Sequence, residues 1–242
     1  MIMSPIRSGN VVIYDYAGVR ASHLEAHAEK LASNVALYQM RLPRLFSERT
    51  INTCVVPDRV FRSWVTPESD AFKPQEARTA GIPSALYGIS DDMIKFPASL
   101  LNLVMLEGWE KEGISHEILH AGSRRIVDAG YKCGIALCGF DGKIDSLDKY
   151  LNEGLTEHIR MSLGGAVVRN RYYPIAMAVG EIIKRVGDAV VLSAYFGEEV
   201  SPFIAAVEGA FGTNSYSAIR EVSRQVVKGN IDPAKLMEVL GK

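Results

Sequence analysis

The sequence predicts an α+β fold: a small N-terminal mixed sheet packed on a helix that carries a His-Glu-x-x-His motif, followed by a mostly α-helical C-terminal lobe. Two observations predict this order. Short β-branched segments gather in the N-terminal half, and from about residue 99 onward apolar residues recur with the 3.6-residue period of a helix. The 242 residues, 48% of them hydrophobic and 23% charged, suit one globular domain spanning 1–242.

The N-terminal lobe, about 1–130, opens with alternating strand and helix signals. VVIYD at 11–15 and INTCVV at 51–56 are short and β-branched, and each predicts a strand. The segment 21–40 predicts a helix, because its apolar side chains recur at helical spacing. Those apolar side chains are Leu24, Ala28, Leu31, Val35 and Tyr38.

Three further segments complete this lobe. VFRSWV at 60–65 predicts a strand, and DMIKFP at 92–97 predicts another that ends at Pro97. The stretch 66–90 is rich in Pro, Ser and charged residues, and it predicts a long surface loop.

In the C-terminal lobe, about 145–242, the spacing of apolar residues predicts helices. The segment 175–186 has a broad apolar face, and Ile219, Val222 and Val226 repeat the helical period nearer the C-terminus. The glycines that punctuate these helices are Gly187, Gly197 and Gly212.

Charge and targeting signals limit the possible partners. Lys and Arg number 27 against 28 Asp and Glu, so the formal charge is -1 and no nucleic-acid or membrane partner is expected. The N-terminal segment lacks the apolar core of a signal peptide, which predicts a cytoplasmic protein, although export without a cleavable signal stays open. Three cysteines are too few for a disulfide framework, and nothing indicates the oligomeric state.

The motif that carries chemistry is HEILH at 116–120. Residues four apart on a helix lie about 40° apart around its axis, so the imidazoles of His116 and His120 can reach one metal ion. Glu117 lies about 100° round from His116, where it can flank a metal without binding it. Ile118 and Leu119 point to the opposite side, which is expected to pack inward.

A second segment, NEGLTE at 152–157, follows His120 after 32 residues. A catalytic zinc takes three protein ligands and keeps one open position, and two His with one Glu is a standard ligand set. We therefore expect His116, His120 and Glu153 to bind Zn²⁺. Glu157 stands one turn beyond Glu153, where it can accept the free N–H of a ligand imidazole and fix the orientation of that ring.

The pair HEILH and NEGLTE resembles the signature of the gluzincin metallopeptidases, in which HExxH is followed by a downstream Glu in an NExxx[DE] context. The resemblance covers roughly 112–122 and 149–158. It implies a zinc peptidase in which Glu117 is the general base, with Asn152 and Glu157 supporting the metal ligands. Peptides or proteins would be the substrates.

The resemblance also implies an oxyanion donor from the segment after the third ligand. The candidates in RNRYYP are Tyr173 and then Tyr172, with Arg169 or Arg171 as partner, and Tyr195 follows as a third candidate. If the strand at 92–97 lay at the sheet edge nearest the metal, it could bind substrate as an added strand.

The chain departs from the best-known gluzincins. The spacing of 32 residues is longer than is common in thermolysin-like proteases and M1 aminopeptidases, and no GAMEN-like segment precedes the motif. The sequence therefore resembles a compact gluzincin that diverges from both families, with 129–150 inserted beside the site. Two alternatives stay open: a regulatory protease with a single protein target, and a zinc-stabilised protein-binding or regulatory module with little or no turnover.

Other metal-like patterns have simpler explanations. His23 and His27 form a second i, i+4 pair, but no carboxylate segment accompanies it, so a solvated helix face is expected. Cys133 and Cys138 lack a second pair and are expected to be buried thiols. A di-iron site would need a second ExxH, which the sequence does not contain.

Overall fold

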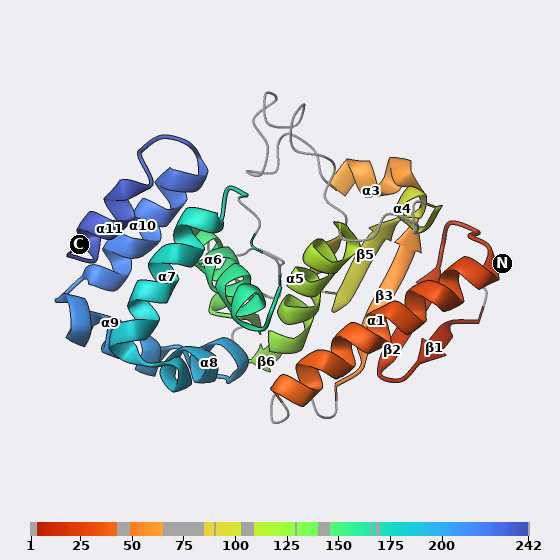
Figure 1. Ribbon diagram of the computed structural model, residues 1–242, viewed down its shortest axis with the longest axis horizontal. Coiled ribbons are helices and arrows are strands. Elements are labelled where there is room, and N and C mark those ends of the chain that lie inside the picture. Colours follow the sequence, from red (N-terminus) through yellow and green to blue (C-terminus); the bar gives the residue numbers. More distant parts are fainter. Residues whose placement is uncertain are drawn as a thin grey trace. The chain divides into compact units, whose positions relative to one another are not determined.

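The computed structural model describes residues 4–42, 49–64, 85–89, 91–102, 109–128, 130–139, 146–165, 167 and 170–241. The chain divides into two units, Met1–Ala121 and Gly122–Lys242. The first unit combines a mixed sheet with helices and the second is mostly helical (Figure 1), so the predicted α+β class is confirmed. None of the described helices is both long enough and apolar enough to cross a membrane.

In the described part of the first unit, five strands form a sheet in the order β1-β2-β3-β5-β4. Its centre is parallel: β2 (Val11–Asp15) pairs with β3 (Ile51–Val56), which pairs with β5 (Met93–Pro97). The outer strands β1 (Ile6–Ser8) and β4 (Leu86–Gly88) run antiparallel to their neighbours. The three strands predicted in this lobe at 11–15, 51–56 and 92–97 are therefore confirmed.

The strand at 92–97 does not form the sheet edge, contrary to the expectation that it could lie there. β4 pairs with it from Met93 to Lys95, so β4 is the outer strand on this side of the sheet. β4 also falls within 66–90, where a loop was predicted; residues 65–84 and 90 lie outside the described part.

Helices cover both faces of this sheet. The register places Ile13, Thr53 and Ile94 on one face, and Phe96 of the same face meets His27 of α1 (Ala21–Arg41), with ring centroids 4.7 Å apart. α1 is the helix predicted at 21–40, and all five of its predicted apolar side chains are buried. On the opposite face, Cys54 packs against α3.

The prediction of a strand at 60–65 is wrong, because α3 (Asp58–Trp64) is a helix. Pro57 precedes it, and its carbonyl accepts bonds from the N–H groups of Val60 (2.8 Å) and Phe61 (3.1 Å). Helical winding lets Phe61 enter the core with no exposed surface while Trp64 stays 43% exposed. Burial of one aromatic side chain here overrides the weak strand preference of the β-branched residues.

Two helices close the first unit. α4 (Ala98–Asn102) follows β5 directly, and α5 (Trp109–Ser123) carries the HEILH motif. The unit boundary falls within α5, between Ala121 and Gly122, so the last two residues of this helix belong to the second unit.

The second unit opens with an antiparallel sheet that the helical period did not predict. Its strands are β6 (Arg125–Val127), β7 (Gly130–Cys133) and β8 (Ala136–Gly139), in that order. Strands of three or four residues leave no readable period. Gly130 and Gly134 take positive φ values of 147° and 59°, a conformation that favours glycine, and at Gly134 it permits the tight turn between β7 and β8.

Helices form the rest of the second unit. α6 (Ser146–Ser162) contains NEGLTE, and α7 (Tyr173–Val186) packs closely on it, because a Cβ added at Gly154 would lie 2.2 Å from Ile175 Cγ2. The remaining helices are α8 (Asp188–Phe196), α9 (Ser201–Phe211), α10 (Ser215–Val227) and α11 (Ala234–Val239).

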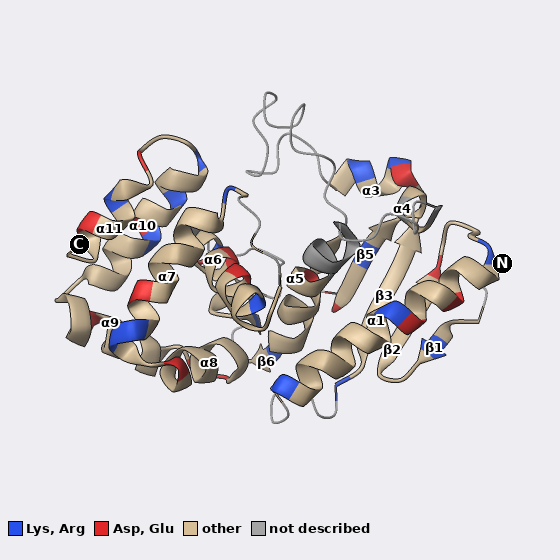
Figure 2. Cartoon of the chain, viewed as in Figure 1, with Lys and Arg blue, Asp and Glu red and all other residues tan. Residues whose placement is uncertain are grey.

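The helices predicted at 175–186 and around Ile219–Val226 are confirmed as α7 and α10. Gly187, Gly197 and Gly212 stand at the C-caps of α7, α8 and α9, as their punctuating pattern predicted. Basic and acidic residues occur together on the helices of each unit (Figure 2), in keeping with the balanced net charge.

Candidate metal centre

The two motif histidines converge on one side of α5. Ile118 and Leu119 have no exposed surface, so their face of the helix is anchored in the core, as predicted. His116 is half-buried and His120 is buried. Their Nε2 atoms lie 3.0 Å apart, which the i, i+4 spacing makes possible.

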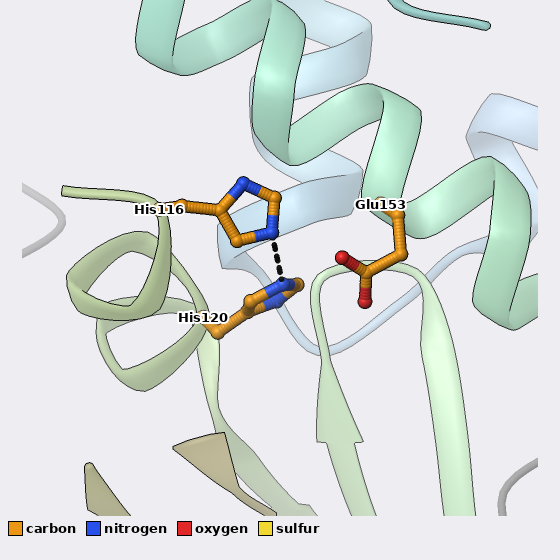
Figure 3. A group of neighbouring side chains, drawn as sticks. All are labelled: His116, His120 and Glu153. Carbon is orange, nitrogen blue, oxygen red and sulfur yellow. Dashed lines mark hydrogen bonds between the residues drawn. The ribbon is translucent and has the colours of Figure 1, made fainter. Parts of the chain in front are cut away.

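Glu153 comes from α6, a helix held by apolar neighbours. Leu151 and Leu155 are 1% and 0% exposed, whereas Glu153 between them is only half-buried. Its carboxylate can therefore reach a partially exposed site while its helix is fixed. One ligand atom each from His116, His120 and Glu153 lies within 4.8 Å of the others, and Figure 3 shows the rings and the carboxylate directed toward one another.

This geometry suits a zinc ion. Zn–N bonds of about 2.0–2.1 Å at a tetrahedral angle separate two ligand nitrogens by about 3.3 Å, and the observed separation is 3.0 Å. Two imidazoles and one carboxylate form a donor set of catalytic zinc sites. The residues present therefore fit the metal that the sequence predicts.

Glu117 precedes Ile118 on α5 and is half-buried, beside the two histidines and outside the ligand group. A carboxylate at this position can accept a proton from water held near the ligands. The role of Glu117 as general base stays a prediction.

Glu157 has a partner that sequence reasoning missed. Its carboxylate, 2% exposed, is bound by the guanidinium of Arg160, 1% exposed, through Nε (3.0 Å) and a terminal nitrogen (2.7 Å). The two residues are i and i+3 on α6, a spacing that could have indicated the pair. The proposed contact of Glu157 with a ligand imidazole remains a prediction.

Asn152, predicted to support the metal ligands, directs its side chain at the β7–β8 turn. Its Oδ1 accepts a bond from the Ile135 N–H at 2.8 Å, and the residue is buried. Asn152 therefore acts on the backbone beside the site.

Of the three tyrosine candidates, Tyr172 is electrostatically coupled to Glu153. Burial raises the pKa of its hydroxyl above the usual range, and the Glu153 carboxylate adds to the rise. Arg171 opposes this effect: it donates to the Tyr172 hydroxyl at 2.8 Å. The hydroxyl is thus protonated at neutral pH and able to donate.

The other oxyanion candidates differ in setting. Tyr173 is half-buried at the start of α7, where its backbone N–H donates to Asn170 O at 3.1 Å. Tyr195 has no exposed surface, and its hydroxyl lies 2.6 Å from Thr156 Oγ1, so it is part of the core. Arg169 lies outside the described residues.

Cys133 and Cys138 are buried and form no disulfide, as expected. The expectation of a solvated face at His23 and His27 is wrong for His27, which is 1% exposed and packs against Phe96. The apolar pattern used to predict this helix counted only apolar residues and Tyr38, so the burial of His27 was not predicted.

Comparisons with known proteins add no identity. No protein-family model matches the chain, and searches of curated proteins and of solved structures found no significant match.

Proposed function

We propose that the chain is a zinc-dependent hydrolase of peptide bonds in which His116, His120 and Glu153 hold the metal. One observation carries this proposal: His116 and His120 of α5 and Glu153 of α6, which follows His120 after 32 residues, place two imidazoles and one carboxylate within 4.8 Å of one another. The three residues of the group belong to the HExxH and NExxxE motifs.

Zinc bound at this site supplies Lewis acidity and lowers the pKa of a bound water toward 7. Glu117 accepts the proton of the attacking water and passes it to the leaving amine. Tyr172, protonated and hydrogen-bonded by Arg171, donates to the oxygen that gains charge as water attacks the amide.

The donor count favours a catalytic site over a structural one. Structural zinc sites are closed by four protein ligands, whereas catalytic sites use three and leave one position for water or substrate. Among the residues that the structure describes, the group has three members. Glu117 beside it is a base that a purely structural site does not need.

The test compares the wild-type chain with Glu117→Gln after zinc loading. Gln keeps the size of the side chain but cannot take up a proton, so zinc content should stay near one per chain while turnover of a peptide library falls at least about 10²-fold. Glu25→Gln is the matched control, because Glu25 lies between the two histidines of the other i, i+4 pair.

Each outcome bears on a separate part of the proposal. Loss of zinc in Glu117→Gln would show that Glu117 is a ligand and that the coordination is misassigned. Unchanged turnover would place the hydrolysis elsewhere in the preparation. A zinc-loaded wild-type chain that cleaves no member of a broad library would refute the peptidase and favour the binding module.

A further inference from the structure

The turn between β7 and β8 donates two consecutive backbone N–H groups to side chains on two different helices. Gly134 N–H donates to Ser123 Oγ, and Ile135 N–H donates to Asn152 Oδ1, each at 2.8 Å. Ser123 has no exposed surface and Asn152 is 3% exposed. We call Gly134–Ile135 the bridging turn.

The two acceptors occupy particular places on their helices. Ser123 is the last residue of α5, three residues after His120. Asn152 stands in α6 directly before Glu153. The bridging turn thus joins the end of the helix that supplies two metal ligands to the segment that supplies the third.

The close approach depends on glycine at position 134. Its φ of 59° is in the left-handed region, and an added Cβ would lie 1.9 Å from Asn152 Oδ1 and 2.7 Å from Tyr195 Cε2. Those distances leave no room for a side chain. The turn is therefore seated directly on the Asn152 amide.

The hairpin and the acceptor are both fixed by other buried bonds. Lys132 Nζ, in β7, donates to the carbonyls of Ala194 (2.6 Å) and Gly197 (2.8 Å) at the end of α8. Thr156 Oγ1 donates its proton to the Asn152 carbonyl at 2.8 Å. In the second hydrogen bond of Thr156, the Tyr195 hydroxyl is therefore the donor and Thr156 Oγ1 the acceptor. A turn held in this way can act as a spacer.

We propose that the bridging turn holds the Asn152–Glu153 segment of α6 at a fixed distance from Ser123, the last residue of the motif helix, with Ser123 and Asn152 as positioning residues. Neither residue belongs to the group of His116, His120 and Glu153; Ser123 accepts from the Gly134 N–H and Asn152 accepts from the neighbouring Ile135 N–H. This inference rests on the proposed function, since it assigns these residues to the geometry of the His116, His120 and Glu153 group.

Metal affinity is the property that such a spacer controls. A ligand set must be held within roughly 0.5 Å of its productive geometry. Removing a partner that hydrogen-bonds a ligand directly costs about 10–100-fold in metal affinity, and we expect residues that hold the ligand-bearing segments to fall at the lower end of that range. The expected losses for Ser123→Ala and for Asn152→Leu therefore fall in that range.

The test measures zinc affinity of the full chain by competition with a chromogenic chelator. Ser123→Ala removes one acceptor, Asn152→Leu removes the other, and Asn152→Asp keeps an acceptor for the Ile135 N–H. Asn152→Asp should bind zinc at least about tenfold more tightly than Asn152→Leu. The control is Tyr216→Phe, which removes a 3.0 Å bond to Asp148 on the same α6 and leaves the turn untouched; its affinity should stay within about twofold of wild type.

The double variant Ser123→Ala with Asn152→Leu separates positioning from independent structural roles. Breaking either bond already interrupts the link from Ser123 through the turn to Asn152. The double variant should therefore lose little more affinity than the single variant with the larger loss. Losses that multiply would overturn the proposal, and so would an equal loss in Tyr216→Phe. If Asn152→Leu does not fold, Ser123→Ala alone tests the proposal. An unchanged zinc affinity in Ser123→Ala would then contradict it.

The proposed function fails in a different way. A wild-type chain that binds no zinc would remove the metal site itself. Tight wild-type binding with unaltered affinity in the single variants would overturn the spacer and leave the metal site standing.

Discussion

His27 should make the first unit sensitive to acid. Its side chain is 1% exposed, contacts Phe96 edge to face, and has no hydrogen-bond partner for Nε2 among the described residues. Burial lowers the pKa of His27 from 6.5 to about 4, and the nearby charge of Lys30 contributes. The imidazole is therefore neutral when folded.

The linkage between protonation of His27 and folding gives the direction and size of the change in stability with pH. Because the folded pKa lies below the unfolded pKa, the unfolded state takes up a proton first as pH falls, and stability is lost between pH 6.5 and about 4. At about 1.36 kcal/mol for each pH unit, the loss reaches about 2 kcal/mol at pH 5 and about 3 kcal/mol at its limit.

The assay is urea unfolding at pH 7.5 and pH 5.0, with chelator present so that metal release makes no contribution. His27→Leu cannot titrate, so it should lose about 2 kcal/mol less stability than wild type between the two pH values. His23→Leu, on the same helix, keeps His27 and should retain the wild-type acid loss. Equal losses in wild type and His27→Leu would refute the assignment of a buried neutral imidazole.

Glu157→Gln should weaken zinc binding by about 10–100-fold in the chelator competition; unchanged affinity with a lowered melting temperature would mean that the carboxylate serves only Arg160. Arg160→Met should destabilise the second unit by about 3–5 kcal/mol in urea unfolding, because it leaves the buried Glu157 carboxylate without its cation; a change below about 1 kcal/mol would contradict this. Tyr172→Phe should lower kcat by about 10²-fold with little change in KM, whereas Tyr173→Phe should not; the reverse ranking would restore Tyr173 as the oxyanion donor.

Local patterns predicted most of the fold where a single physical factor dominates. The β-branched segments at 11–15 and 51–56 are buried parallel strands, and the apolar period at 21–40 is the buried face of α1. Prediction failed where tertiary contacts decide. Phe61 turns 58–64 into a helix, and the strands of 125–139 are too short to show a period.

In the candidate site, too, some features could be predicted from the sequence and others could not. His116 and His120 are joined by helix geometry, and Glu153 was predicted from the ligand chemistry of zinc, so all three could be selected from sequence. The bonds of Asn152 could not, because its partner is a backbone N–H in a turn. Every residue except proline has a backbone N–H, so the residue types at 134 and 135 do not indicate which side chains their N–H groups bind. The bridging turn could therefore not be predicted from the sequence.

X-ray absorption at the zinc edge of the purified full chain tests the central claim most directly. The account predicts one zinc per chain with a shell of nitrogen and oxygen at about 2.0–2.1 Å and the outer scattering of two imidazoles. His120→Ala should lose one imidazole contribution or the metal altogether. A sulfur shell at about 2.3 Å would assign the metal to cysteine. That result, or a chain that retains no zinc, would contradict the site at His116, His120 and Glu153.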